Sequence, residues 1–500
     1  MGIERSAEIA CLAVLMGFNA SCLSGGCSSH VPNDTPKPNL HDQGFDVRLG
    51  DMPAEQLPEQ VESKRAWSVY TMCPGVWSAP DHLTRHDMFV RTREPGSTDE
   101  VLSFNLKLPL SAGGYPTTVA MVSLDVKTGK ELRCMPLPMP QAVGSEMTRY
   151  DPKRRVAFYA FHTRSVEGGG SLDGMPTDGV LGIHVDTGET ALKYTKKDEL
   201  DEKSVNVIAH AFDRTQVVSN LGTDGLISLD ANTGEELWTL GGEIPGRAGT
   251  PWVLIHLLTP TPHRLFLLDR RQDIFEVDNK GRVTHRHGIG DKGDLYGPLL
   301  MGDVIVLEEH GFDRHVTKIL SDWGGPVVHE ELDCGSFFTL GPKRLGCVEF
   351  SQYSQQARIV GVNIDGTQRV ERTLKVPDGM DRVILNKVIA LSSRHVAVSM
   401  SGSRKGDDGF SRSVRDVYIV DLERPELEPT HVELVREVDN WGEDLRTTPL
   451  FTKSGMLLVA AWGAFHGIQT NIPWTDRGPA PRGVWVSDNQ NSGYAWFGEL

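Results

Sequence analysis

The chain has 500 residues, of which 52 are glycine and 29 are proline, and its formal net charge is −16 at pH 7. This acidic balance, with no long basic stretch, excludes nucleic acid as the expected partner, because phosphates are bound by clustered Lys and Arg. The glycine and proline content predicts many turns, and the length permits one large domain.

The N-terminus contains an apolar run, IACLAVLMGF, at residues 9–18. This run is too short to span a bilayer, but it has the length of a signal-peptide core. The small residues SGG then precede Cys27, an arrangement that resembles the bacterial lipobox, in which a cysteine receives lipid. Residues 1–27 are therefore predicted to be a signal peptide with lipidation at Cys27. Lipidation at Cys22, secretion without lipid, and a mis-assigned start or cytosolic protein are the alternatives.

Residues 28–62 are polar and rich in proline, and they have few apolar side chains. They are predicted to be a flexible tether that precedes a folded domain at 63–500. Four cysteines follow the leader: Cys73, Cys134, Cys334 and Cys347. An oxidising compartment would allow two disulfides in one of three pairings, and the alternative is four buried free thiols.

A hairpin phrase recurs along the folded domain. The stretch GLISLDANTGEELWTLGG at 225–242 contains a strand, a turn rich in Asp, Asn and Gly, and a second strand. Closely similar phrases occur at 122–132 and 181–189. Weaker copies end at residues 281, 325, 367, 424 and 493, which gives eight hairpin signals in all. Further strand-like runs, such as WVLIHLL and HRLFLLD, precede the copies.

The repeats predict a unit of four short strands. A four-stranded sheet cannot bury both faces alone, whereas a ring of such sheets buries each one against its neighbours. We therefore predict an all-β fold, an eight-bladed β-propeller with four-stranded antiparallel blades, and seven blades as the alternative. Residues 65–70 are predicted to be an outer strand that latches the last blade, which residues 493–500 would end.

The repeat phrase resembles that of the pyrroloquinoline-quinone-like, or quinoprotein dehydrogenase-like, β-propellers. The residues that carry the resemblance are Leu229, Asp230, Thr233, Gly234, Leu237 and Trp238, then Leu124, Asp125, Thr128, Gly129 and Leu132, and finally Thr187 and Gly188. In that family the tryptophan packs on the neighbouring blade. Here only Trp238 and Trp496 stand in that place, so the resemblance implies that Leu, Val or Tyr closes the other blades.

The resemblance implies either an enzyme or a scaffold. The enzymes hold pyrroloquinoline quinone on a calcium ion and commonly carry two adjacent cysteines, which this sequence lacks. The non-catalytic members include exported scaffold lipoproteins of the machinery that assembles outer-membrane β-barrels. The acids of the repeat turns have a sufficient role as backbone caps. We predict no catalytic, cofactor-binding or metal-binding residues, with a quinone- or metal-dependent periplasmic oxidoreductase as the runner-up.

One histidine pair has the spacing of two metal ligands. His285 and His287 lie two apart on one strand face, a spacing that can ligate a metal ion. We interpret them as a partly exposed strand pair.

Long insertions are predicted between the second and third strands of blades 1, 2, 7 and 8, at residues 92–116, 165–179, 401–415 and 465–483. Loops on a rigid scaffold are the usual place for binding. Phe465 and Trp474 are therefore candidate partner contacts, and the alternative is that they cover an adjacent blade. The expected function is a monomeric, lipid-anchored protein-binding scaffold of the cell envelope; a surface protein that binds carbohydrate or polymer is a further alternative.

Overall fold

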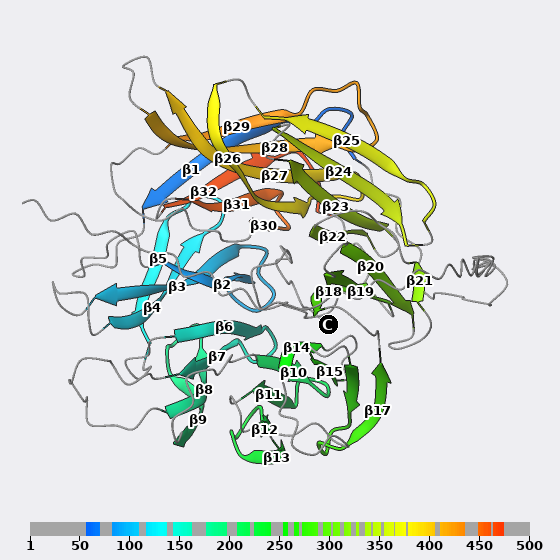
Figure 1. Ribbon diagram of the computed structural model, residues 1–500. Helices are drawn as coiled ribbons and strands as arrows, with labels where there is room; N and C mark the ends of the chain where they lie inside the picture. The colour runs from blue at the N-terminus through cyan, green and yellow to red at the C-terminus, as the bar shows by residue number, and fades with distance from the viewer. Residues whose placement is uncertain are drawn as a thin grey trace, which may run out of the picture. The chain divides into compact units, whose positions relative to one another are not determined.

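The computed structural model describes residues 57–70, 83–109, 117–137, 144–162, 177–197, 208–220, 225–241, 254–258, 265–269, 273–288, 294–301, 304–310, 315–321, 327–329, 336–341, 344–351, 355–364, 366–376, 379–405, 411–435, 449–461 and 464–474. Every helix or strand assigned in these ranges is a β-strand, and the strands form eight four-stranded antiparallel sheets (Figure 1). No helix in the same ranges is long and apolar enough to cross a membrane. The prediction of an all-β propeller is confirmed, and the sheets equal the predicted blades in number.

Seven blades consist of strands that are consecutive in sequence. Blade 1 has β2 (Leu83–Thr92), β3 (Glu100–Pro109), β4 (Thr117–Asp125) and β5 (Glu131–Pro136), and blade 2 has β6 (Gly144–Asp151), β7 (Val156–His162), β8 (Thr177–His184) and β9 (Thr190–Lys197). Blade 3 has β10 (Ile208–Ala211), β11 (Gln216–Asn220), β12 (Leu226–Asp230) and β13 (Glu236–Leu240), and blade 4 has β14 (Leu254–Leu258), β15 (Leu265–Asp269), β16 (Asp273–Val277) and β17 (Val283–Gly288).

The next three blades follow the same order. Blade 5 has β18 (Asp294–Met301), β19 (Val304–His310), β20 (His315–Ser321) and β21 (Val327–His329), and blade 6 has β22 (Ser336–Gly341), β23 (Arg344–Ser351), β24 (Gln356–Asn363) and β25 (Val370–Lys375). Blade 7 has β26 (Met380–Ala390), β27 (His395–Lys405), β28 (Ser411–Asp421) and β29 (Thr430–Val435).

Blade 8 joins the two ends of the described chain. It contains β30 (Leu450–Phe451), β31 (Met456–Ala461) and β32 (Ala464–Thr470), and its fourth strand is β1 (Ser63–Tyr70) from the N-terminal side. The predicted latch by the N-terminal strand is therefore present. Residues 493–500, which were predicted to end this blade, and the hairpin signal at 484–493 lie outside the described residues.

The core lies between blades, as the repeat predicts. Leu226, Ile227 and Leu229 of β12 are each at most 1% exposed. Since successive side chains of a strand point to opposite faces, both faces of this strand are buried. They belong to one apolar cluster that runs from blade 2 through blade 3 to blade 4. Other clusters join blade 1 to blade 2, blade 6 to blade 7, blade 7 to blade 8, and blade 8 to blade 1.

Two cysteines test the disulfide alternatives. Cys134 in β5 and Cys347 in β23 are each disulfide-bonded, so neither is a free thiol. Cys73 and Cys334 lie outside the described residues, as do Cys22 and Cys27. The alternative of four free thiols is therefore wrong, and all three disulfide pairings stay open.

Candidate functional site

One face of the propeller carries the turns between the first and second strands and between the third and fourth strands of the blades. We call it the turn face, and the opposite one the loop face. The repeat motif builds the turns between third and fourth strands. Asp230 Oδ1 accepts the amide protons of Asn232 and Thr233 at 2.8 and 2.9 Å, and Gly234 donates to the Asp230 carbonyl at 2.9 Å. These hydrogen bonds lower the pKa of Asp230.

Blades 1 and 2 repeat this turn. Asp125 Oδ1 accepts the amide proton of Thr128 at 2.8 Å. Burial alone would raise the pKa of Asp125, but the hydrogen bonds from Thr128 and the charge of Arg93 outweigh it, so the pKa is lowered. Gly129 and Gly188 have φ of +69° and +83°, a region that glycine adopts readily. The turn acids are occupied as backbone caps.

In blades 1 to 4, a large side chain of the preceding blade covers the turn glycine. A Cβ on Gly281 of blade 4 would lie 2.7 Å from the ring of Trp238 in blade 3, as the family resemblance implies. A Cβ on Gly129 of blade 1 would lie 2.6 Å from the ring of Trp67, which β1 contributes to blade 8. Trp67 Nε1 also donates to the Val126 carbonyl at 2.9 Å. Trp67 was not predicted to cover a turn glycine of the next blade. Trp496, which was predicted to do so, lies outside the described residues.

Long polar side chains also connect successive blades on the turn face. Gln216 accepts hydrogen bonds from Ser228 and Trp238 within blade 3 and donates to the Asn279 carbonyl of blade 4 at 3.0 Å. Arg344 of blade 6 bonds Glu423 of blade 7 at 2.6 Å. These contacts make the turn face a rigid belt, in which many charged groups hold the blades together.

The densest part of this belt joins blades 1 and 2. Arg155 binds Asp186 through two nitrogens, at 2.5 and 2.8 Å, and Arg91 binds the same carboxylate at 3.2 Å. Arg133 donates to the carbonyls of Asp186 and Thr187. Burial would raise the pKa of Asp186, but these arginines outweigh it and lower the pKa. Protein oxygens accept the hydrogen bonds of these arginines, so we interpret the arginines as groups that hold blades 1 and 2 together.

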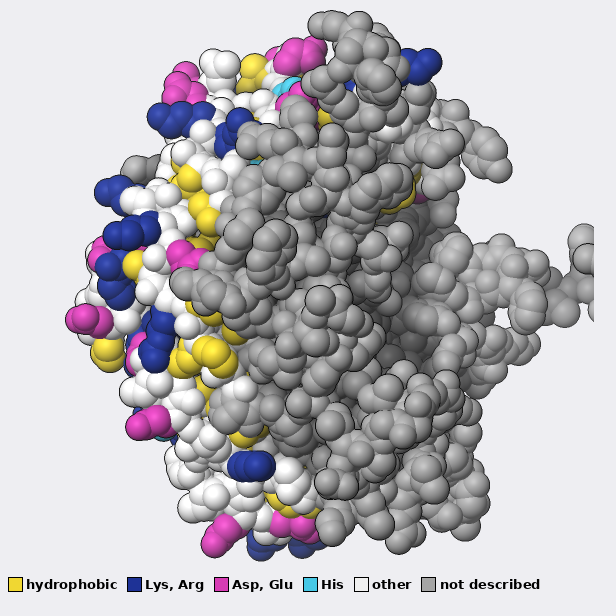
Figure 2. Space-filling view, turned by 90° about the vertical axis from the view of Figure 1, so that its left-hand side faces the viewer, with side chains coloured by type: hydrophobic (Ala, Val, Ile, Leu, Met, Phe, Trp, Pro, Cys, Tyr) yellow, Lys and Arg dark blue, Asp and Glu magenta, His cyan; other side chains and the backbone are white. Residues whose placement is uncertain are grey.

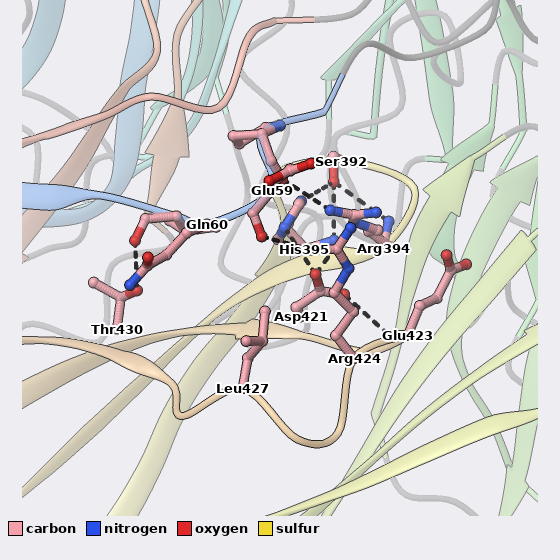
Figure 3. Close-up of polar contacts among 12 residues, drawn as sticks. Glu59, Gln60, Ser392, Arg394, His395, Asp421, Glu423, Arg424, Leu427 and Thr430 are labelled. Atoms are coloured by element: carbon pink, nitrogen blue, oxygen red, sulfur yellow. Dashed lines mark hydrogen bonds and ion pairs between the residues drawn. The ribbon is translucent and has the colours of Figure 1, made fainter.

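Blade 7 contains the most enzyme-like constellation in the described chain (Figure 3). Ser392 Oγ lies 2.8 Å from His395 Nδ1, and His395 Nε2 lies 3.4 Å from Asp421 Oδ2. A Ser-His-Asp arrangement performs nucleophilic catalysis only where substrate reaches the hydroxyl. Ser392 and His395 are both 0% exposed. Ser392 Oγ instead accepts the backbone amide of His395 at 2.9 Å, so the cluster shapes the turn before β27.

Blade 7 is also the most elongated blade, as Figure 1 shows. Strands β27 and β28 have 11 residues each, whereas β11 and β12 of blade 3 have five. The pairs His395↔Asp421 and Gln216↔Asp230 occupy the turn-face ends of these hairpins. From there, the blade 7 hairpin continues six residues, or about 20 Å of strand, further toward the loop face.

A polar cluster formed by side chains of β27, β28 and β29 lies where this extension begins. The buried Asp416 lies 3.1 Å from Arg404, 2.9 Å from His431 and 3.2 Å from the Tyr418 hydroxyl. Arg404 also pairs with Glu433. The side chains of Arg404, Glu433 and His431 are 30%, 34% and 39% exposed, and the His431 ring stacks on Tyr418 at 4.8 Å. Burial, followed by the charge of Asp416, raises the pKa of Tyr418. The extension therefore presents both signs of charge on a fixed frame.

The structure corrects the predicted insertions in all four blades. Residues 100–109, assigned to the blade 1 insertion, form β3, and residues 465–470, assigned to blade 8, belong to β32. In blade 7 the predicted insertion at 401–415 is largely the extended hairpin, because Lys405 pairs with Ser411. Residues 177–179 of the predicted blade 2 insertion belong to β8, and its residues 165–176 lie outside the described residues.

The two candidate aromatic contacts differ. Phe465 is 2% exposed, and its ring lies 4.1 Å from that of Phe104 in blade 1, so the prediction of an exposed Phe465 is wrong. Trp474 is partly exposed and packs against the apolar cluster between blades 7 and 8, with its ring 6.0 Å from that of Phe451. The alternative that it covers an adjacent blade agrees with this position.

Among the described residues, no group of three or more His, Cys, Asp and Glu side chains is placed to hold a metal ion. His285 and His287 lie in β17, opposite Glu276 and Ile274 of β16. The surface in Figure 2 shows Lys and Arg side chains mixed with Asp and Glu over the described residues.

No family model and no curated protein matches the sequence. Solved structures that align with the chain include BamB from Moraxella catarrhalis, at 11% identity over 82% of this chain and 100% of that chain, with a TM-score of 0.47. The C-terminal WD40 domain of Sif2 aligns at 12% identity over 79% and 98%, with a TM-score of 0.49. The WD40 domain of SCAP from fission yeast aligns at 9% over 79% and 97%, with a TM-score of 0.43. None of these alignments assigns a function to this chain.

Proposed function

We propose that the chain is an exported, lipid-anchored β-propeller that binds a protein partner of the cell envelope and uses no quinone or metal cofactor. The observation that carries the binding role is the extension of blade 7. It continues about 20 Å beyond the hairpin of blade 3 and presents partly exposed charged groups on a hydrogen-bonded frame. Binding residues are commonly held above a rigid scaffold in this way.

Export is supported by chemistry as well as by the leader. Disulfides persist in oxidising compartments and are rare in the cytosol, and both Cys134 and Cys347 are disulfide-bonded. The predicted lipidation at Cys27 precedes the first described residue, Leu57, by 30 positions. A flexible chain of 30 residues has a root-mean-square reach of about 30 Å, so a tether of the predicted kind would hold the ring near a membrane without fixing it there.

The binding role is tested by crosslinking in cells. A photo-crosslinking amino acid placed at Lys405, at the exposed end of β27, should capture one envelope protein. The same amino acid at Lys280, exposed on the turn face of blade 4, is the matched control and should capture none. Equal capture from both positions would place the binding surface elsewhere.

A shortened hairpin provides the complementary variant. Arg404 and Arg412 face each other in the sheet, so residues 405–411 can be replaced by an Asn-Gly turn while Arg404 is retained. This variant should keep its melting temperature within a few degrees and lose the partner. Full partner binding by a folded variant would contradict the assignment.

Anchoring and cofactor use have their own tests. Cys27→Ala should release the protein from membranes, and unchanged membrane association in both this variant and Cys22→Ala would refute lipidation. Purified protein mixed with pyrroloquinoline quinone and calcium should show neither a bound quinone spectrum nor alcohol oxidation. Turnover under these conditions would establish the oxidoreductase alternative.

A further inference from the structure

The two disulfide-bonded cysteines of the described chain lie in different parts of the ring. Cys134 of β5 packs against the apolar cluster that joins blade 8 to blade 1. Cys347 is in β23 of blade 6, next to Val348, which belongs to the cluster between blades 6 and 7. Because successive side chains of a strand point to opposite faces, Cys347 points away from blade 7. A disulfide joins Cα atoms about 6 Å apart, and whole blades separate these two positions, so Cys134 and Cys347 have different partners.

A described strand on the way to Cys73 runs beside the strand of Cys134. Cys73 lies outside the described residues, three positions after Tyr70, the last residue of β1. Strand β1 runs from the turn face to the loop face, because Tyr70 pairs with the first residue of β32, beside the loop-face turn of blade 8. Strand β5 runs in the same direction from the turn that contains Gly129. The Trp67 ring lies against Gly129, so the two strands are in register at this contact.

The lengths of these strands allow a bond between Cys73 and Cys134. Tyr70 is three residues beyond Trp67 toward the loop face, or about 10 Å. Cys134 is five residues beyond Gly129 in the same direction, or about 17 Å. Three further residues span up to about 10 Å. The chain that follows Tyr70 is therefore long enough to bring Cys73 level with Cys134.

The other pair lies within one blade. Cys334 is outside the described residues, two positions before Ser336, the first residue of β22 in blade 6. Ser336 pairs with Val348, the residue that follows Cys347. Two residues span up to about 7 Å, which allows Cys334 to reach Cys347 but not Cys134 in blade 1.

We propose that Cys73 is bonded to Cys134 and Cys334 to Cys347, and that the first bond is a reducible fastener between blade 8 and blade 1. It ties the chain that leaves β1, the outer strand of blade 8, to the outer strand of blade 1. The same two blades are joined by the hydrogen bond from Trp67 Nε1 to the Val126 carbonyl. This pairing rests on the proposed export, which supplies an oxidising compartment and removes or lipidates the leader cysteines.

The two bonds differ in access to a reductant. Cys134 is partly buried, whereas Cys347 is 1% exposed. Thiol–disulfide exchange requires that a thiolate reach a sulfur of the bond, so a dithiol should cleave the bond of Cys134 first. Dithiothreitol gives two electrons and two protons to the sulfurs of Cys73 and Cys134 and becomes a cyclic disulfide. Two thiols then replace the bond between the blades.

Peptide mapping of the mature, unreduced protein tests the pairing. Trypsin separates the four cysteines into peptides 66–85, 134–149, 319–343 and 345–358. After free thiols are blocked, mass spectrometry should find 66–85 joined to 134–149, and 319–343 joined to 345–358. Joining of 66–85 to 345–358 would overturn the pairing and leave export intact. Free thiols in all four peptides would overturn both the pairing and the export on which it rests.

Two matched double variants test the fastening of β1. In Cys73→Ala/Cys134→Ala, the backbone amides of β1 should exchange with deuterium at least ten times faster than in wild type, because the bond to blade 1 is lost. Cys334→Ala/Cys347→Ala is the control and should leave exchange in β1 unchanged. Dithiothreitol without denaturant should reproduce the first result in wild type. Equal exchange in β1 of both variants, or cleavage of the Cys347 bond before that of Cys134, would refute a reducible fastener.

Discussion

Protonation of His466 should weaken the junction where the N-terminal strand closes blade 8. His466 is 2% exposed and bonds Ser68 of β1 through Nδ1. Burial, followed by the charges of Arg65 and Arg415, lowers the pKa of His466 from 6.5 to about 4. A further positive charge beside these two arginines is therefore unfavourable.

The magnitude follows from proton linkage. Because the pKa is lower in the folded state, the unfolded chain binds this proton more readily between pH 6.5 and pH 4, and stability falls as the pH falls through that window. At 1.36 kcal/mol for each pKa unit, the full effect below pH 4 is about 3 kcal/mol. Between pH 7 and pH 5, the loss attributable to His466 is about 2 kcal/mol.

The assay compares wild type with His466→Gln, which is neutral at every pH and retains a polar group near Ser68. Urea unfolding at pH 7 and pH 5 should show a larger loss for wild type, by about 2 kcal/mol, since all other titrating groups are common to both proteins. If the two proteins lose the same stability between these pH values, protonation of His466 does not control the junction.

Three further substitutions test the turn face by urea unfolding. Gly129→Ala should lower the free energy of unfolding by about 1–3 kcal/mol more than the control Gly96→Ala. Both glycines have positive φ, but only Gly129 lies under Trp67. Equal losses would contradict the packing role of Gly129. Ser392→Ala should cost about 1–3 kcal/mol by removing a buried acceptor, and unchanged stability would speak against its structural role. Asp186→Asn should cost about 1–2 kcal/mol, reduced by the partial exposure of the carboxylate, and no loss would show that the arginines do not depend on it.

Local patterns predicted the turns well. The Asp-x-x-Thr-Gly phrase specifies an acid that caps amides within three residues and a glycine with positive φ, so its geometry depends on adjacent positions alone. The hairpins at blades 1 to 4 were found in this way. Closure of the last blade by the N-terminal strand was also predicted from a local pattern. Residues 65–70 look like an outer strand, and no partner strand lies next to them in sequence.

Contacts between segments far apart in sequence explain why part of the blade 8 insertion was predicted wrongly. Residues 465–470 were predicted to belong to the long insertion of blade 8. Gly467 is a strand residue because the Trp67 ring fills the place of its side chain. No local pattern in either segment identifies the other as its partner. The error at β3 was avoidable, since residues 101–108 alternate between apolar and polar types over most of their length.

A recurring arginine is a second signal of the blades in the sequence. Arg155, Arg344 and Arg394 lie at the start of the second strand in blades 2, 6 and 7, and each reaches a chain segment outside its own blade. A basic residue before an apolar strand has no local explanation, because its function is to bind carbonyl or carboxylate groups of another segment. Its recurrence is nevertheless visible in the sequence.

The turn glycine is a better indicator of a blade than the tryptophan that covers it. The covering residue is tryptophan over Gly129 and Gly281, methionine over Gly188 and leucine over Gly234. The conformation is the same at all four, with φ between +69° and +83°. Side chains of different shape can fill the space above a glycine, whereas few residues other than glycine adopt this φ without strain. A search for the Leu-Trp ending therefore undercounts the blades of such a ring, while a search for Gly after an Asp- or Asn-containing turn finds blades 1 to 4.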